Sequence, residues 1–295
     1  MISKNIIVIT GGAGFVGTNL IKFFIKKTKY KFISLDNYST GTKKNHIKNS
    51  RVKYINGKTS NISKFIKNPK KIKTIFHFGE FARIYQSFIK MNECIESNSV
   101  GSNAVFNFCL KNNIKLIYSA TSASLGNKGE DKNLSPYAFL KAKNLELLEN
   151  LKKWFNLKYE VIYFYNVYGP HQIEKGTMST VIGIFEDHFK KKKFLPVVKP
   201  GSQTRRFTHI TDTVEICYLA WKKNLCRHYS IANKKSYSLI DVAKMFNSKI
   251  KYLPKRKGER HSSALINKNL SNKIYKYFGK INIKDYIQDF VKNNS

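Results

Sequence analysis

The chain has 295 residues, of which 42% are hydrophobic and 24% charged, so it can bury a sizeable core and does not have the composition of a disordered protein. It contains no run of roughly 18 apolar residues, no amino-terminal signal segment and no CxxC pair, which predicts a cytoplasmic protein with free thiols, no membrane span and no metal site. The net charge of +36 attracts anions, but only seven of the 54 basic residues are arginine and the lysines are spread along the chain, so we expect a solvated surface and no specific nucleic-acid partner.

Short apolar runs alternate with longer amphipathic stretches through the first half of the chain. The apolar runs predict strands at 5–10, 31–35, 52–55, 74–78, 115–118 and 159–165. The amphipathic stretches predict helices at 14–28, 92–111 and 135–155. This alternation indicates an α/β protein with a Rossmann-type, doubly wound parallel sheet.

The pattern becomes irregular after residue 170. Helices are predicted at 179–191, 212–222 and 239–246, with short strands at 227–231 and 249–253. These elements predict a smaller mixed α/β part. We therefore expect a dinucleotide-binding domain at 1–168 and a substrate-binding part at 169–295, closely packed and partly interleaved.

A glycine turn joins the first predicted strand to the first helix. Gly11, Gly14 and Gly17 have the spacing that lets backbone N–H groups approach a pyrophosphate at a helix N-terminus. Asp36 ends the second predicted strand, where a carboxylate accepts hydrogen bonds from both hydroxyls of an adenosine ribose. A carboxylate there repels a 2′-phosphate, so the pattern predicts NAD rather than NADP.

The glycine turn is also part of a family resemblance. The segments TGGAGFVG (10–17) and DNYSTG (36–41) resemble the extended short-chain dehydrogenase/reductase family, in particular its NAD-dependent nucleotide-sugar epimerases and dehydratases of the UDP-glucose 4-epimerase type. The resemblance continues in order through HFG (77–79), Asn98 with Gly101, Tyr137-x-x-x-Lys141, YNVYGP (165–170) and RRFTHITD (205–212). It implies NAD, a nucleoside-diphosphate sugar and a homodimer. The cofactor contacts that it implies are Gly11, Gly14, Phe15, Val16, Gly17, Asp36, Asn37, Phe78, Gly79, Tyr137 and Lys141.

Tyr137 and Lys141 are the candidate proton-transfer pair. Four residues apart on a helix, they share a face, and a nearby ammonium is expected to lower the pKa of the tyrosine until it can act as a base. The resemblance implies that Lys141 also holds the nicotinamide ribose and that Thr121 bonds the same sugar hydroxyl as Tyr137. The implied reaction removes a proton from a sugar hydroxyl, typically O4, while hydride passes from that carbon to NAD.

Three fates of the resulting ketone stay open. Dehydratases of the family carry Asp-Glu directly after the catalytic Thr, whereas this chain has Ser122 and Ala123, which argues against a 4,6-dehydratase. A 4-epimerase is favoured over a C4 dehydrogenase or reductase. A non-catalytic dinucleotide-fold binding protein is the alternative from another class, but it predicts erosion of the Tyr–Lys pair.

The substrate contacts come mainly from the second half of the chain. The resemblance implies that Arg205 and Arg256 bind a pyrophosphate, that Asn166 bonds the same diphosphate and that Glu259 holds the ribose of the nucleotide. Two further polar residues, Glu80 and Arg83, follow the fourth strand where a sugar pocket is expected, whereas Arg206 and Arg260 are interpreted as surface charge. For the homodimer, the helices at 92–111 and 135–155 are expected to pair across a two-fold axis through Val105, Phe106, Leu145 and Leu148.

Overall fold

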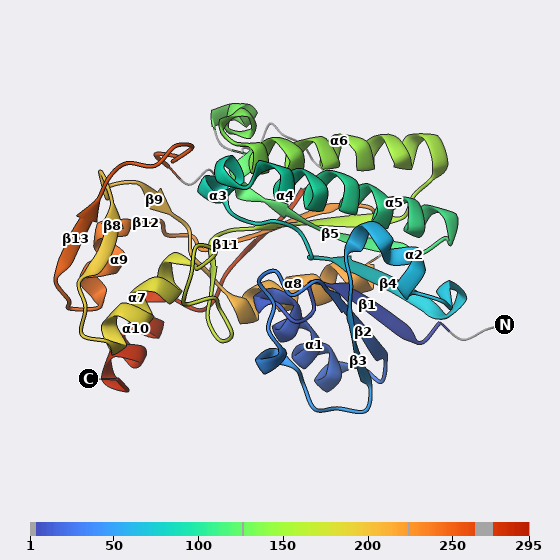
Figure 1. Cartoon of the computed structure of the whole chain (residues 1–295), viewed down its shortest axis with the longest axis horizontal. Helices are drawn as coiled ribbons and strands as arrows, with labels where there is room; N and C mark the ends of the chain where they lie inside the picture. Colours follow the sequence, from blue (N-terminus) through green and yellow to red (C-terminus); the bar gives the residue numbers. More distant parts are fainter. Residues whose placement is uncertain (1–3, 126, 224, 263–273, 295) are drawn as a thin grey trace.

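A sheet of eight parallel strands forms the centre of the protein. The computed structural model describes residues 4–125, 127–223, 225–262 and 274–294. The strand order is β14-β11-β6-β5-β4-β1-β2-β3 (Figure 1). Its strands are β1 (Ile6–Thr10), β2 (Lys31–Asp36), β3 (Val52–Asn56), β4 (Ile72–His77), β5 (Lys115–Thr121), β6 (Tyr159–Phe164), β11 (His228–Ala232) and β14 (Ile274–Phe278). The predicted Rossmann-type α/β class is confirmed.

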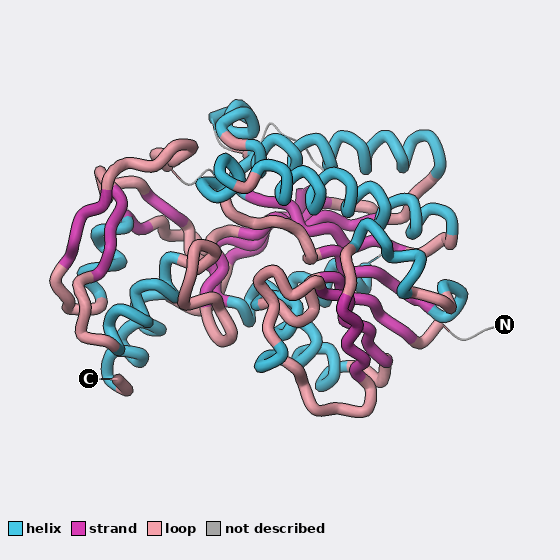
Figure 2. The backbone as a smooth tube through the Cα atoms, in the orientation of Figure 1, coloured by secondary structure: helices cyan, strands magenta, loops and turns pink. Residues whose placement is uncertain are grey.

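Helices lie on both sides of this sheet (Figure 2). In β1 the side chain of Val8 packs into one core with α5 (Ser102–Lys111) and α6 (Pro136–Phe155). Ile7 and Ile9 point to the opposite face and pack with α1 (Phe15–Lys27) and α8 (Ile210–Lys223). Both faces are therefore buried, which explains why the strands are almost continuously apolar.

The helix predicted at 92–111 is interrupted. It consists of α4 (Met91–Ile95), a π-helical segment at Glu96–Gly101, and α5. The π-helical segment presents the buried Asn98, whose side chain accepts from the Phe81 N–H at 2.7 Å and donates to the Phe81 carbonyl at 2.8 Å. Through these two hydrogen bonds, Asn98 of the π-helical segment holds the loop that follows β4 in place.

A smaller part lies beside the large sheet, at the left of Figure 1. Its core contains Phe185, Val197, Phe246 and Ile287. Its helices are α7 (Val181–Lys190), α9 (Leu239–Met245) and α10 (Ile283–Lys292), beside the parallel pair β8 (Leu195–Val198) and β13 (Ile250–Leu253). Two short pairs, β7 (Val167–Tyr168) with β10 (Thr208–His209) and β9 (Thr204–Arg205) with β12 (Tyr237–Ser238), lie along the connections. The remaining short helices are α2 (Ile62–Phe65) and α3 (Ile84–Ile89).

The chain returns to the large sheet after entering the smaller part. The elements α8, β11 and β14 all follow residue 168, yet they cover or extend the large sheet. The division of the chain into domains at residue 168 stays a prediction. Elements that precede and follow residue 168 therefore belong to the same large sheet.

The apolar residues predicted for a dimer interface lie inside the subunit. Val105, Phe106 and Leu148 have no exposed surface, and the partly buried Leu145 packs against the same core, which lies between these helices and the sheet. Their assignment to an interface is therefore wrong. Helical periodicity shows which face is apolar, but it does not show whether a sheet or a second subunit covers that face.

None of the described helices is long and apolar enough to cross a membrane. The same residues contain no cluster of His, Cys, Asp and Glu that could hold a metal ion. Cys94, Cys109 and Cys217 are buried free thiols, and Cys226 is half-buried and free.

Candidate active site

The predicted cofactor residues meet at the carboxyl edge of the sheet. The strand order reverses beside β1, which lies between β2 and β4, and ligands of doubly wound sheets bind at such a point. The turns after these strands line a cavity of about 310 Å³. Of the predicted cofactor contacts, the cavity is lined by Gly11, Gly14, Phe15, Val16, Gly17, Asp36, Asn37, Phe78 and Gly79.

The glycine turn is packed too tightly for side chains at two of its three positions. Gly11 has a φ of +70°, and a Cβ there would lie 2.8 Å from the Gly79 Cα. A Cβ at Gly17 would lie 2.2 Å from the Gly11 carbonyl oxygen. Gly14 is less restricted, since a Cβ there would lie 3.2 Å from the same oxygen. Glycine is thus required where the backbone of the turn packs against itself and against the loop after β4.

Asp36 ties the end of β2 to this turn. Its carboxylate accepts from the Ala13 N–H at 2.9 Å and from the Tyr38 N–H at 2.8 Å, and burial raises the pKa of the carboxyl group. No acidic residue occupies the first turn of α1, so its N-terminus is free to face an anion. The tightly packed turn, this helix terminus and the carboxylate beside the cavity fit NAD.

The other two predicted cofactor contacts, Tyr137 and Lys141, are not among the residues that line the cavity; both lie on the buried face of α6. Ser135 begins the helix, because its side chain accepts from the Ala138 N–H at 3.1 Å and Pro136 occupies the first turn. The pKa of Tyr137 is raised to about 12, mainly by burial; a hydrogen bond with Thr121 at the end of β5 lowers it and the charge of Glu80 raises it. The expected lowering of the tyrosine pKa is therefore wrong for this arrangement.

Lys141 is held by a carboxylate instead of facing the cavity alone. Its ammonium donates to Glu80 and to the Ser119 carbonyl, and it lies 3.3 Å from the Ser119 hydroxyl. The side chains of Lys141 and Glu80 are 3% and 2% exposed, so this ion pair is almost completely dry. Glu80 is one of the residues that line the cavity, and its carboxylate forms an ion pair with Lys141.

Two predicted substrate residues form a direct ion pair in the smaller part. Arg205 donates to Glu259 at 2.6 Å, and its second terminal nitrogen donates to the Thr204 and Arg260 carbonyls. Arg256 is exposed, with its guanidinium 5.4 Å from the ring centre of Tyr85.

The other two predicted contacts hold backbone. Asn166 donates to the Arg206 carbonyl at 3.3 Å. Arg83 lines the cavity and donates to the Met178 carbonyl at 2.9 Å and the Ala82 carbonyl at 2.6 Å. Arg83 also lies close enough to Tyr137 for their charges to interact, so the structure brings it to the proton-transfer pair.

Arg260 is not a surface residue, so that prediction is wrong. It is 6% exposed, donates to the Ser122 carbonyl at 2.9 Å and lies 3.8 Å from Asp131. Arg206 is half-buried and donates to the Asn233 carbonyl at 2.8 Å. No local pattern marks Arg260, because its partners come from segments more than a hundred residues away in the chain.

Asn144 was also missed, although the sequence contains a signal for it. It lies three residues after Lys141 and seven after Tyr137, and therefore on the same face of α6. Its amide donates to the Asn98 carbonyl at 2.7 Å and to the Tyr118 hydroxyl at 3.0 Å. A polar residue at this spacing on an otherwise buried helix face indicates a shared polar site.

Comparison with known proteins gives the family. A model of the "NAD dependent epimerase/dehydratase family" matches residues 7–232. The chain belongs to this family. The predictions of an enzyme of the extended short-chain dehydrogenase/reductase type and of NAD as its cofactor are thereby confirmed.

Relatives in this family cover the whole chain. A putative UDP-glucose 4-epimerase from Methanocaldococcus jannaschii is 25% identical, over 98% of this chain and 99% of its own length. The structure of a UDP-N-acetylglucosamine 4-epimerase from Methanobrevibacter ruminantium, in complex with UDP-N-acetylmuramic acid, superimposes with a TM-score of 0.84 and 25% identity, over 99% and 98% of the two chains. A dTDP-glucose 4,6-dehydratase from Streptomyces venezuelae, with 17% identity, a TM-score of 0.86 and coverage of 97% and 96%, shares the fold.

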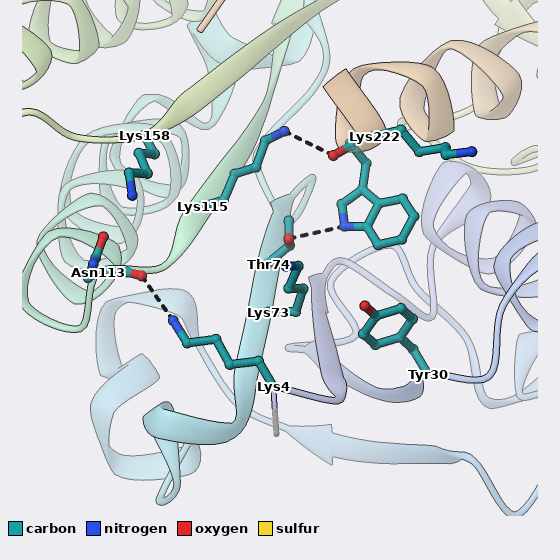
Figure 3. Close-up of a pocket in the computed structure, with 9 residues that line it drawn as sticks. Lys4, Tyr30, Lys73, Thr74, Asn113, Lys115, Lys158 and Lys222 are labelled. Atoms are coloured by element: carbon teal, nitrogen blue, oxygen red, sulfur yellow. Dashed lines mark hydrogen bonds between the residues drawn. The ribbon is translucent and has the colours of Figure 1, made fainter. Parts of the chain in front are cut away.

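A second cavity lies at the opposite edge of the sheet. It has a volume of about 360 Å³ and lies where β4 and β5 begin, with the lysines drawn in Figure 3 around it. Lys115 donates to the Ala220 and Trp221 carbonyls at 3.0 Å each, and the Trp221 indole donates to Thr74 at 3.1 Å (Figure 3). The glycine turn and the Tyr–Lys pair belong to the carboxyl edge, so this lysine-lined cavity is separate from the candidate active site.

Proposed function

We propose that the protein is a nucleotide-sugar 4-epimerase that works on a nucleoside-diphosphate sugar with a tightly held NAD. The observation that carries this proposal is the placement of Tyr137 against Thr121 at the carboxyl end of β5, close to Glu80 and Arg83, which line the cavity that fits NAD. The residues after Thr121 are Ser122 and Ala123, and neither can act as the acid or base for loss of water. The two 4-epimerase relatives support the same choice.

The chain's own residues move one proton. When bound, NAD accepts a hydride from the sugar carbon and returns it. Tyr137 takes the proton from the O4 hydroxyl as the C4 ketone forms, and it gives the proton back when the ketone is reduced from the other face. Thr121 holds the same oxygen by a hydrogen bond, and Lys141 holds the nicotinamide ribose. Proton and hydride are both restored, so the product differs from the substrate only in configuration at C4.

The smaller part supplies the contacts to the nucleotide. We assign the diphosphate to Arg205, Arg256 and Asn166 and the ribose to Glu259. The Arg205–Glu259 ion pair, with side chains 10% and 22% exposed, holds two of these groups in place. The two 4-epimerase relatives described above are both named for UDP-sugars, so a uridine nucleotide is our first candidate.

A panel of nucleoside-diphosphate sugars tests the proposal. We expect one pair of C4 epimers to interconvert without added cofactor, with proton NMR resolving the products. Release of a ketone with net NAD reduction indicates the C4 dehydrogenase or reductase instead, and a 4-keto-6-deoxy product indicates the dehydratase. If NAD binds and no sugar reacts, the non-catalytic binding protein is favoured.

Replacing Arg205 by alanine should raise KM about 10- to 100-fold and leave kcat within a few-fold of the parent value. A charge-assisted contact to a diphosphate is worth about 1.5–3 kcal/mol, and a contact away from the reacting carbon binds ground state and transition state alike. Arg51→Ala is the control, because Arg51 bonds the Ile25 and Thr28 carbonyls at the far edge of the sheet and should affect stability alone. A loss confined to kcat in Arg205→Ala contradicts the assignment.

We also propose that the protein is a homodimer. The helices α3 and α4 and the π-helical segment expose Ile89, Met91, Ile95 and Val100 by 40–62% of their surface. Such an apolar patch is typical of a subunit interface. Light scattering should show twice the chain mass at micromolar concentration, and Ile95→Asp should shift the protein to the monomer. A monomeric parent protein contradicts this proposal.

A further inference from the structure

The buried partner of Lys141 has no role in the mechanism above. Glu80 follows β4 by three residues, and its carboxylate accepts hydrogen bonds from four side chains on three elements. One oxygen pairs with Lys141 of α6, and the other accepts from the Ser102 hydroxyl of α5 at 2.6 Å, the Tyr118 hydroxyl of β5 at 3.1 Å and the Asn144 amide of α6 at 3.3 Å. A carboxylate with this many donors in a dry site is held in one position.

The same network reaches the cofactor loop. His77 bonds Thr10 at 2.8 Å and Ser102 at 3.1 Å. The Thr10 hydroxyl in turn accepts from the Phe78 and Gly79 N–H groups. Hydrogen bonds therefore run without a break from the end of β1 through His77 and Ser102 to Glu80 and Lys141. The position of the lysine is coupled to the loop that lines the cavity.

We propose that Glu80 is a positioning residue that fixes Lys141 and cancels its positive charge, so that Lys141 alone does not set the acidity of Tyr137. The Lys141 ammonium donates to the Glu80 carboxylate and to the carbonyl and hydroxyl oxygens of Ser119. The opposite charges of Glu80 and Lys141 largely cancel, so the electric field of the pair at Tyr137 is small compared with that of a lone ammonium. Burial lowers the pKa of Lys141, and the charge of Glu80 opposes this lowering.

Titratable or charged groups surround this pair and Tyr137. These groups are His77 on β4, Tyr118 on β5, Cys94 on α4, Tyr137 on α6, Arg83 before α3 and Arg260 in the loop after β13. Burial lowers the pKa of His77 to about 4, raises that of Cys94 to about 11 and holds that of Tyr118 well above its usual value. The two arginines stay cationic. Tyr137 is the group in this cluster that carries the proton of the proposed reaction, and the charge of Glu80 raises its pKa.

The test uses the NAD-loaded protein with Glu80→Gln, Lys141→Met and the double variant. Tyrosine labelled at its phenol carbon reports ionisation by NMR, and the Tyr137 resonance is assigned by its loss in Tyr137→Phe. In Glu80→Gln, removal of the anion should lower the pKa of Tyr137 by about one unit or more, and the acidic limb of kcat against pH should move down equally. In the double variant both charges are gone, so the Tyr137 pKa should return to within about half a unit of the parent value.

Glu96→Gln is the matched control. Glu96 lines the same cavity, but its side chain is 45% exposed and bonds Ser60, so its loss should leave the Tyr137 pKa unchanged. An unchanged Tyr137 pKa in Glu80→Gln overturns the inference, and so does a double variant that shifts as far as Glu80→Gln. If Glu80→Gln does not fold, the comparison moves to Lys141→Met, whose Tyr137 pKa should exceed that of the double variant by about one unit or more.

The inference rests on the proposed function only for the role of Tyr137 in proton transfer. The NMR titration needs no substrate. If the parent protein converts no nucleotide sugar while the titration behaves as expected, the proposed function fails and the charge compensation stands. If the parent protein is a 4-epimerase and the titration shows no shift, the inference alone fails.

Discussion

Replacing Tyr137 by phenylalanine should lower kcat by at least about 100-fold and leave NAD bound. The ring, which is 9% exposed and packed on the buried face of α6, is kept, whereas the hydroxyl that bonds Thr121 and carries the transferred proton is lost. General-base catalysis contributes about 10² to 10⁴ in rate, which sets the size of the effect. Turnover of the nucleotide sugar and the absorbance of co-purified NAD measure the two quantities separately.

Tyr163→Phe is the matched control for that variant. Tyr163 is equally buried, and its hydroxyl bonds His228 at 3.1 Å within the sheet, away from the cavity. The Tyr163→Phe variant should be somewhat less stable than the parent protein and should keep the parent kcat. Near-parental turnover in Tyr137→Phe would rule out this tyrosine as the proton-transfer group, whatever the fold.

Replacing Gly17 by alanine should destabilise the protein and abolish cofactor retention. The new Cβ would lie 2.2 Å from the Gly11 oxygen and 2.7 Å from the Gly12 Cα, and both atoms are backbone that cannot turn aside. Overpacking of this kind costs about 1–3 kcal/mol, which corresponds to a fall in Tm of about 2–5 °C for a chain of this size. Thermal unfolding followed by circular dichroism, with and without added NAD, measures both effects.

Gly14→Ala separates packing from binding. Its Cβ would lie 3.2 Å from the Gly11 carbonyl oxygen, so the Tm without added NAD should fall by less than about 2 °C. Any loss in this variant should concern NAD affinity alone. Equal falls in Tm for the two variants would show that the turn does not pack as described.

Local chemistry was readable from the sequence. The glycine spacing, the carboxylate at the end of β2 and the Tyr–Lys pair are each short-range patterns; the glycines and Asp36 line the cavity, and Tyr137 and Lys141 share the buried face of α6. The strands and long helices were predicted for the same reason. Apolar periodicity within about 20 residues is enough to form them.

What the sequence did not show depends on contacts between distant segments. The Glu80–Lys141 pair joins residues 61 positions apart, and the Arg260–Ser122 contact joins residues 138 apart. The π-helical turn at Asn98 forms because that side chain bonds the Phe81 backbone, and nothing in its own helix requires it. The residues assigned to a dimer face were misplaced because the sheet, not a partner, covers them.

Conversion of a nucleotide sugar carrying deuterium at C4 tests the central claim most directly. The account predicts that the protein forms the C4 epimer with the deuterium still on C4, in water and without added cofactor, because the hydrogen that leaves this carbon is returned to it. Mass spectrometry and proton NMR of the product read the label. Loss of the deuterium to solvent, or accumulation of a released ketone, would contradict epimerisation by oxidation and reduction at C4.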